Sequence, residues 1–251
     1  MSIFSVVATP IGNLEDITLR ALDVLRNVDL ILCEDTRVTK RLLDRHDIRQ
    51  PTLSYHAHSK ISRTADIIRQ LREGKNIALV SDAGTPGISD PGAELVKRIR
   101  QELAEELKSG SVKIETIPGP SALTAALSIA GVPCADFTFL GFLPHKKGRE
   151  TLFKEIAASD RTMVFYESPH RIMKTLQKLE EQRAGSLEPG GRGEKQEEGR
   201  KKDQKIVTVC RELTKVFEEV VSGSATEVKK YFDGHPDKVR GEFVVIVSAH
   251  K

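Results

Sequence analysis

The chain has 251 residues, enough for two modest domains, and its 39% hydrophobic and 30% charged residues are typical of a soluble globular protein. A net charge of +3 is compatible with an anionic partner without requiring one, and 5% aromatic residues without tryptophan give no obvious stacking platform for single-stranded nucleic acid. The three cysteines are widely spaced, no charged segment precedes the first apolar run, and no apolar stretch reaches membrane-spanning length. We therefore expect a cytoplasmic protein without structural zinc, signal peptide or membrane span.

In the first half of the chain, short apolar strands alternate with amphipathic helices. The predicted strands are 3–8, 29–34, 52–55, 76–81 and 112–117. The predicted helices are 16–28, 36–46, 63–73 and one that begins at Asp90-Pro91 and runs to 107. Asp90 is expected to be the N-cap of this last helix and Pro91 its first residue.

The segment PGPSA at 118–122 marks the expected boundary between an N-terminal domain, 1–117, and a C-terminal domain, 118–251. The predicted strands of the second half are 137–142, 161–166, 205–210, 214–222 and 242–248. Its predicted helices are 121–130, 149–158, one that starts at Ser168-Pro169, and 225–233 with a capping box of Ser224 and Glu227. This alternation predicts two α/β domains with mainly parallel sheets. Residues 183–205 are rich in glycine and in charges of both signs, and we expect a disordered loop there.

Five loops rich in glycine, proline, serine or acidic residues follow predicted strands: 8–13, 33–37, 81–92, 117–122 and 166–171. One such loop would indicate ordinary turn chemistry, but five at corresponding strand ends predict a ligand-binding cleft. The chain contains no G-x-G-x-x-G, no G-x-x-x-x-G-K-[ST], no G-x-S-x-G and no H-E-x-x-H motif. Bare backbone without a phosphate motif favours a nucleoside-like ligand, because glycine lets the backbone come close to it.

Seven segments resemble, in order and spacing, the ribosomal RNA small-subunit methyltransferase I family, a branch of the tetrapyrrole methylase superfamily. They are VATPIGNLEDITLRAL, CEDTR, ALVSDAGTPGISDPG, IPGPSALTAAL, GFLP, FYESPHR and RELTK. The resemblance implies two α/β domains with S-adenosylmethionine in the cleft between them, and a homodimer. It also implies methylation of the ribose 2′-hydroxyl of a cytidine in the decoding region of small-subunit ribosomal RNA, either as RNA or in the assembled subunit.

The resemblance further implies which residues bind the cofactor. They are Pro10, Ile11, Gly12, Gly84, Thr85, Gly87, Ile88, Ser121, Ala122, Tyr166, Leu213, Gly241 and Glu242. Charged residues on loops of the same predicted cleft are candidates for proton transfer and for positioning the substrate: Glu34, Asp35, Arg37, Glu167, His170, Arg171 and Lys215. For Asp35 the alternative is a helix cap, and for Glu167 it is an ion pair with a neighbouring arginine.

Two basic segments are candidates for contact with RNA phosphates. Arg37, Arg41 and Arg45 recur every fourth residue and so share one helix face, which we call the arginine stripe. Lys146, Lys147 and Arg149 lie together beside Phe142 and Pro144, and His56 and His58 form a third, weaker candidate. For the stripe, the alternative is an ordinary solvated helix face.

Two other functions compete with RNA methylation. One is methylation of a small molecule, which would require a deep and mainly apolar pocket. The other is a non-enzymatic RNA-binding module, which would not bind S-adenosylmethionine.

Overall fold

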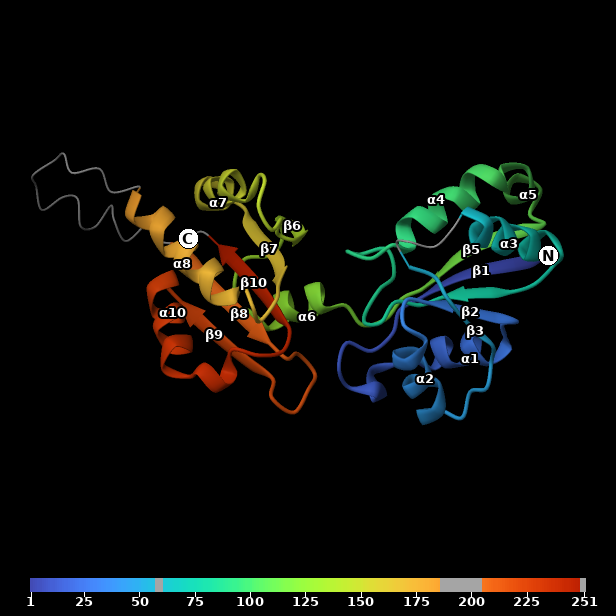
Figure 1. Ribbon diagram of the computed structural model, residues 1–251, viewed down its shortest axis with the longest axis horizontal. Coiled ribbons are helices and arrows are strands. Elements are labelled where there is room, and N and C mark those ends of the chain that lie inside the picture. Colours follow the sequence, from blue (N-terminus) through green and yellow to red (C-terminus); the bar gives the residue numbers. More distant parts are fainter. Residues whose placement is uncertain (57–60, 186–204, 249–251) are drawn as a thin grey trace, which may run out of the picture. The chain divides into compact units, whose positions relative to one another are not determined.

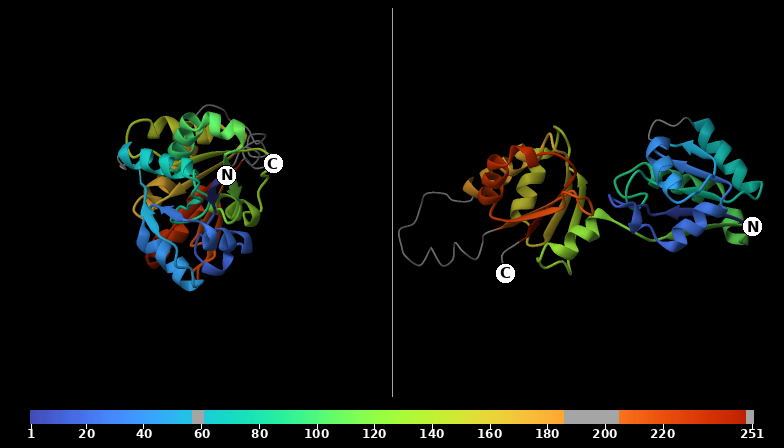
Figure 2. Two further views of the ribbon diagram at one scale, coloured as in Figure 1. Left: turned by 90° about the vertical axis from the view of Figure 1, so that its right-hand side faces the viewer. Right: turned by 90° about the horizontal axis from the view of Figure 1, so that it is seen from below.

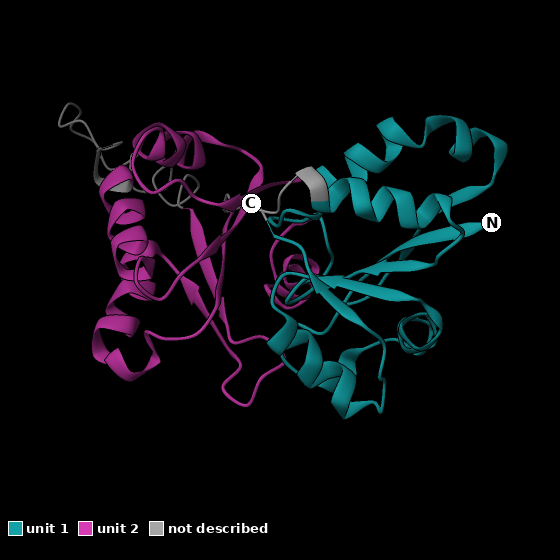
Figure 3. Cartoon of the chain, turned by 45° about the vertical axis from the view of Figure 1, so that its right-hand side comes forward, with its two compact units in different colours: residues 1–121 teal, residues 122–251 magenta. Residues whose placement is uncertain are grey.

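The computed structural model describes residues 1–56, 61–185 and 205–248. Its contacts divide the chain into two compact units, residues 1–121 and 122–251 (Figures 1 and 3). This division falls after Ser121, whereas the sequence analysis places the domain boundary after residue 117. Residues 186–204, most of the predicted disordered loop, lie outside the described residues.

Unit 1 is built on a five-stranded sheet in which every pairing is parallel. Its strands are β1 (Ser2–Val7), β2 (Leu30–Cys33), β3 (Thr52–Ser54), β4 (Ile77–Leu79) and β5 (Val112–Ile117), in the order β3-β2-β4-β1-β5. β1 pairs along its whole length with β5, from Ser2 opposite Val112 to Val7 opposite Ile117. A parallel sheet needs cover on both faces, which explains the continuous apolar strands in the sequence.

Helices cover both faces of this sheet (Figures 1 and 2). The helices of unit 1 are α1 (Leu19–Asn27), α2 (Thr36–Arg45), α3 (Ile61–Arg72), α4 (Gly92–Glu102) and α5 (Ala104–Ser109), with a 3-10 turn η1 (Leu14–Asp16) before α1. Leu25 of α1 and Leu43 of α2 belong to one buried cluster, while Ile68 of α3 and Ile99 of α4 belong to another. The predicted helix 91–107 is interrupted at the buried residue Leu103, whose φ of −112° and ψ of 28° are not helical.

Unit 2 contains a second five-stranded sheet, and there the prediction of a mainly parallel sheet is wrong. Its strands are β6 (Phe137–Phe142), β7 (Thr162–Glu167), β8 (Ile206–Arg211), β9 (Glu219–Gly223) and β10 (Phe243–Ser248), in the order β6-β7-β10-β8-β9. β6 and β7 are parallel, but β10 runs antiparallel to both of its neighbours, and β8 pairs antiparallel with β9. β8 and β9 are consecutive and joined by a loop without a crossover helix, so they can only form an antiparallel hairpin. The prediction of two α/β units is confirmed.

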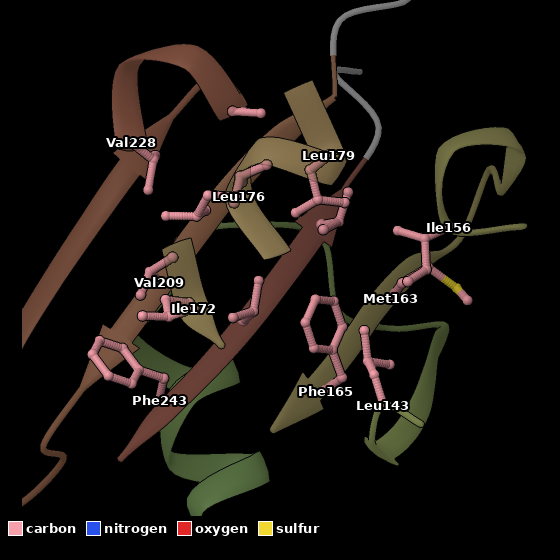
Figure 4. Close-up of a cluster of buried hydrophobic side chains, with 14 of the residues drawn as sticks. Leu143, Ile156, Met163, Phe165, Ile172, Leu176, Leu179, Val209, Val228 and Phe243 are labelled. Atoms are coloured by element: carbon pink, nitrogen blue, oxygen red, sulfur yellow. The ribbon is translucent and has the colours of Figure 1, made fainter. Parts of the chain in front are cut away.

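Three helices of unit 2 contribute side chains to the largest apolar cluster of the described residues. Figure 4 shows side chains of this cluster. The helices of unit 2 are α6 (Ala122–Ile129), α7 (Arg149–Ala158), α8 (Ile172–Gly185) and α10 (Ala225–Gly234), with a 3-10 turn η2 (Pro236–Lys238). Ile156 of α7, Leu176 of α8 and Val228 of α10 lie in this cluster with Phe165 and Phe243 of the sheet. α6 packs on β10, and its residue Ala126 accepts a 3.9 Å hydrogen bond through its carbonyl oxygen from the thiol of Cys210 on β8.

Three features of unit 2 refine the sequence prediction. The capping box of Ser224 and Glu227 is confirmed at the start of α10. α8 begins at Ile172 and not at Ser168-Pro169, because the N–H groups of Arg171 and Ile172 close a turn on the carbonyl oxygen of Ser168. The predicted strand 214–222 shortens to β9, because Thr214 has a φ of +65° and the chain turns there.

No helix among the described residues combines the length and apolar character needed to cross a membrane. The three cysteines are free. Burial raises the pKa of the Cys210 thiol to about 12, which makes it a poor nucleophile at neutral pH.

Candidate active site

The loops after β1 and β4 lie side by side at the carboxyl edge of the unit 1 sheet. β1 connects through α1 to β2, and β4 connects through α4 to β5, so the two connections leave adjacent strands in opposite directions. α1 and α4 accordingly belong to the two different buried clusters of the sheet. This is a topological switch point, the place where open α/β sheets bind ligands. Both loops were predicted to hold the cofactor.

A two-residue bridge fixes these loops to each other. The N–H of Thr9 donates to the carbonyl oxygen of Gly84 at 2.9 Å, and the N–H of Gly84 donates back to that of Thr9 at 3.0 Å. The hydroxyl of Thr9 also donates to the carbonyl oxygen of Ser81 at 3.1 Å. Thr9 and Ser81 are buried, and the sequence analysis missed both. The available signal was a polar residue directly after an apolar strand.

Gly84 and Gly87 have the left-handed φ angles +82° and +89°, which strain any residue with a Cβ. An added Cβ at Gly87 would meet only ordinary contacts, the nearest being the Ala93 nitrogen at 3.8 Å. Asp90 closes the loop, since its carboxylate accepts the N–H groups of Gly87 and Gly92, each at 2.7 Å. Backbone conformation therefore explains both glycines. α4 begins at Gly92, one residue after the predicted Pro91.

The loop after β5 packs against the same place. An added Cβ at Gly119 would lie 3.1 Å from the Cβ of Ala8, and one at Gly84 would lie 3.4 Å from Cγ2 of Ile11. Thr85 donates from its hydroxyl to the carbonyl oxygen of Pro120 at 3.2 Å. The loops after β1, β4 and β5 are thus closely packed against one another, as far as Pro120 near the end of unit 1.

Two residues of these loops are accessible to a ligand. Gly12 is exposed, and Ile88 is 44% exposed. Within residues 1–56, 61–185 and 205–248, the backbone N–H groups of Gly12 and Ile88 donate to no protein acceptor. Free N–H groups beside an apolar contact suit a nucleoside-like ligand. Pro10 and Ile11 are buried, so Gly12 and Ile88 are the accessible parts of the two loops.

Two neighbouring carboxylates after β2 have opposite properties. Asp35 caps α2 by accepting the N–H of Arg37 at 2.8 Å, and the Arg37 guanidinium binds the same carboxylate at 2.6 Å. These hydrogen bonds lower the pKa of Asp35 to about 2, so it is a weak proton acceptor. Burial, and then the charges of Asp82 and Asp90, raise the pKa of Glu34.

The arginine stripe on α2 is partly neutralised. Arg37 pairs with Asp35, and Arg45 pairs with Glu15 of η1 at 3.0 Å. Arg41 is exposed and has no ion-pair partner in the part of the chain that the structure describes. Of the three, Arg41 is the cation best placed to meet an external anion.

Glu167 of β7 is the centre of a buried ion-pair cluster. Its side chain is fully buried, and its carboxylate lies 2.7 Å from Nε of Arg171 and 3.2 Å from Nη2 of Arg149. It also accepts the hydroxyl of Thr175 at 2.6 Å and the N–H of Ser168 at 2.9 Å. This placement favours the ion-pair alternative over a role as base, and it removes Arg149 from the surface predicted to contact RNA. His170, which lies between Glu167 and Arg171 in the sequence, is exposed.

The RELTK segment of unit 2 forms a second charged cluster. Lys215 donates to the carboxylates of Glu212 and Glu242, at 2.8 Å each, and the N–H of Glu242 donates to Glu212 at 3.0 Å. Gly241 has a φ of +86°, and an added Cβ there would collide with the side chain of Glu212. Three predicted residues, Lys215, Gly241 and Glu242, are thereby brought together around Glu212. The fourth, Leu213, follows Glu212 in the chain and is buried. Lys215 is neutralised by two carboxylates, which favours a structural role.

Three other predicted residues of unit 2 lie on β7 and in the loop after β6. Tyr166 is half-buried, hydrogen-bonded to the backbone of Leu123, and burial raises its pKa. Lys146 and Lys147 are exposed. His56 is exposed in unit 1, while His58 lies outside the described residues, and the described residues contain no group of three side chains that could hold a metal ion.

Comparison with known proteins identifies the family. The family model of Tetrapyrrole (Corrin/Porphyrin) Methylases matches residues 4–229. Ribosomal RNA small subunit methyltransferase I of Thermotoga maritima is 41% identical over 243 residues, which cover 97% of this chain and 96% of that protein. The protein of the same name from Vibrio cholerae is 41% identical over 250 residues, covering 99% and 78% of the two chains.

Solved structures agree in fold. Cobalt precorrin-4 methyltransferase CbiF superposes with a TM-score of 0.63 at 17% identity, covering 98% of this chain and 94% of that one. The methyltransferase CobJ gives a TM-score of 0.61 at 19% identity, covering 99% and 93%. At this identity the likeness concerns the fold alone. The sequence kinship and the fold together establish that the chain belongs to the tetrapyrrole methylases and, among them, to the ribosomal RNA small subunit methyltransferase I family.

Proposed function

We propose that this protein is an S-adenosylmethionine-dependent methyltransferase that modifies the ribose 2′-hydroxyl of a cytidine in the decoding region of small-subunit ribosomal RNA. The near full-length kinship to proteins named ribosomal RNA small subunit methyltransferase I carries the proposal. The loops of unit 1 support it, since they offer free backbone N–H groups and an exposed apolar side chain to a nucleoside-like cofactor. We further propose that the enzyme is a cytoplasmic homodimer.

The cofactor is assigned to the carboxyl edge of unit 1 and to predicted residues of unit 2. In unit 1, Gly12 and Ile88 offer backbone N–H groups, and Gly84 and Gly87 hold the loop of Ile88 in its left-handed turns. Ser121 and Ala122, the last residue of unit 1 and the first of unit 2, are assigned to the same cofactor. Tyr166, Leu213, Gly241 and Glu242 are assigned to the adenine side. When bound, S-adenosylmethionine supplies an electrophilic methyl group.

We assign proton acceptance to Glu34. Asp35 is held by Arg37 with a pKa of about 2, and Glu167 is buried with two arginines. Glu34 has no arginine or lysine partner in the described part of the chain, and burial with Asp82 and Asp90 raises its pKa. A base whose pKa lies closer to neutral pH is the more effective proton acceptor, and Glu34 would receive the proton of the ribose hydroxyl. The other residues of the site then have to align that hydroxyl with the methyl group of the cofactor.

Positioning of the RNA is assigned to the exposed cations. Arg41 on α2 and Lys146 and Lys147 after β6 are exposed and have no carboxylate partner among the described residues. Contacts of this kind go to phosphates and carry no sequence information, so they would orient the RNA without selecting the nucleotide.

The test is transfer of labelled methyl from S-adenosylmethionine to unmodified small ribosomal subunits, to RNA extracted from them, and to a blank without RNA. We expect label in the subunits or the extracted RNA and none in the blank. Binding of S-adenosylmethionine is measured by calorimetry on the same preparation.

The outcomes separate the competing functions. Cofactor binding without transfer to either RNA substrate would contradict the proposal and favour a small-molecule substrate. Absence of both binding and transfer would favour a non-enzymatic RNA-binding module.

A further inference from the structure

β6, an edge strand of the unit 2 sheet, contains a β-bulge that changes the face on which one aromatic side chain lies. Phe139 lies opposite Val164, but the next pair joins Phe142 to Tyr166, so β6 advances three residues while β7 advances two. Gly141, within the bulge, has a left-handed φ of +61°. One extra residue in a strand moves every later side chain to the other face of the sheet.

The bulge places Phe142 outside the core. Leu140 and Leu143 pack in the apolar cluster under α7 and α8, and Phe142 would face that cluster in a regular strand. Instead it shares the opposite face with Phe139 and Tyr166. It is 55% exposed, far more than Leu143 at 1%. Exposing a large apolar ring is unfavourable, so a bulge that does so requires an explanation from function.

Two aromatic neighbours hold the ring from behind. The rings of Phe142 and Tyr166 meet edge to face with centroids 5.4 Å apart, and Phe139 meets Tyr166 in the same way at 5.0 Å. The Tyr166 hydroxyl is itself fixed by its hydrogen bond to the backbone of Leu123. Phe142 is therefore the exposed member of a supported aromatic trio, which we call the aromatic platform.

A cationic loop follows the platform directly. His145, Lys146 and Lys147 are exposed, and no carboxylate in the described ranges pairs with either lysine; the nearby Glu150 pairs with Lys178 at 3.2 Å. The start of the loop is fixed, because Arg171 donates to the carbonyl oxygen of Leu143 at 2.8 Å and Arg149 to that of Pro144 at 3.1 Å. Both arginines are anchored by the buried Glu167.

We propose that Phe142 stacks on an unpaired base of the RNA substrate while Lys146 and Lys147 contact its phosphates. An exposed ring beside unpaired lysines matches the chemistry of single-stranded RNA, which offers flat bases and a charged backbone. Glu167, Arg149 and Arg171 are positioning residues, since they fix the loop that carries the lysines. This assignment rests on the proposed RNA-methylating function and adds the place where the substrate is gripped.

The experiment measures binding of unmodified small ribosomal subunits to the full chain and to the variants Phe142→Leu, Phe142→Tyr and Phe137→Leu. Phe137 is the matched control, a 37% exposed aromatic residue on the same strand. Loss of the ring in Phe142→Leu should weaken binding by about tenfold, within the range of base stacking on an aromatic side chain. Phe142→Tyr keeps a ring and should bind like the wild type, as should Phe137→Leu. Cofactor affinity should be the same in all four proteins.

The double variant Lys146→Glu, Lys147→Glu provides a second readout. In a plot of the logarithm of the binding constant against the logarithm of the salt concentration, the slope should become shallower by about one for each lost phosphate contact. Equal binding by wild type and Phe142→Leu, in a preparation that transfers methyl to subunits, would overturn this inference and leave the proposed function standing. A loss of cofactor affinity in Phe142→Leu would overturn it too, by making the ring a cofactor contact. Failure of the wild type to bind or methylate subunits would instead contradict the proposed function.

Discussion

The loops at the carboxyl edges of the two sheets are held in different ways. In unit 1, backbone hydrogen bonds between Thr9 and Gly84 and left-handed glycines fix the loops, with Asp90 accepting two N–H groups. In unit 2, a fully buried carboxylate, Glu167, fixes the loops through two arginines. Backbone geometry makes a close-fitting wall, whereas buried charge fixes a loop and leaves its other side chains exposed.

This difference predicts different weaknesses. The unit 1 loops should lose their conformation when a residue with a Cβ replaces a left-handed glycine, while the rest of the fold changes little. The unit 2 loops should fail when a charge is removed, because the remaining buried charges lose their partner. A pair such as Asp35 and Arg37, whose arginine side chain is 86% exposed, should matter far less to stability.

The largest effect is expected for Glu167→Ala. Removing this carboxylate leaves Arg149 and Arg171, whose side chains are only 14% and 15% exposed, without a counter-charge, and the loss in free energy of unfolding should be about 3–5 kcal/mol. Thermal unfolding and denaturant titration measure it. Glu150→Ala is the control, since Glu150 is exposed and pairs with Lys178 at the surface. Similar stability of the two variants would remove the distinction between the two edges.

Gly87→Val comes next and acts on the cofactor. A β-branched residue at a φ of +89° costs about 1–2 kcal/mol and shifts the loop, so affinity for S-adenosylmethionine should fall by about tenfold or more. Gly110→Val is the matched control, because Gly110 has a φ of +76° but precedes β5, at the opposite edge of the sheet. Calorimetry giving equal affinities for both variants would exclude our account of the loop.

Glu34→Gln sharpens the comparison within unit 1. Because the pKa of Glu34 is raised, the rate of methyl transfer by the wild type should begin to fall with decreasing pH at a pH above the usual glutamate range. The variant should lose most of the activity, and its remaining activity should lack this fall at acidic pH. The raised pKa also means that the folded state keeps this proton to higher pH than the unfolded chain does. The carboxylate therefore reduces stability as pH rises through its folded pKa, so Glu34→Gln should be more stable than the wild type at neutral pH. A pH–rate profile unchanged by the substitution would reject Glu34 as the base.

Charge reversals on the arginine stripe should have the smallest effects. Arg41 is exposed and unpaired among the described residues, and its reversal should weaken RNA binding by a few-fold and leave cofactor affinity unchanged. Arg45→Glu should weaken it less, because Arg45 already pairs with Glu15. If both variants bind RNA like the wild type, the arginine stripe is an ordinary solvated face.

Much of the fold was predictable because it depends on local periodicity. The helices 36–46 and 149–158 and the strands 112–117 and 137–142 match α2, α7, β5 and β6 closely. The direction of the strands in unit 2 was not predictable, since an apolar run does not say whether it pairs parallel or antiparallel. The β-bulge at Gly141 was equally hidden, because it depends on register with β7.

Residue types predicted the candidate site better than residue roles. The glycine loops and the charged segments were found from sequence, but their partners are set by the fold. Glu167 and Asp35 look alike in sequence, each followed closely by an arginine, yet the side chain of Glu167 is fully buried, whereas Asp35 caps α2 and pairs with an exposed arginine. The aromatic platform was missed for the same reason, because composition alone shows few aromatics and no stacking surface.

The most direct test of the central claim is mass spectrometry of nucleosides from small ribosomal subunits treated with this protein and S-adenosylmethionine. The wild type should yield 2′-O-methylcytidine, and Glu34→Gln and Gly87→Val should yield far less. A methyl group on a base, or no modified nucleoside although the cofactor binds, would contradict it.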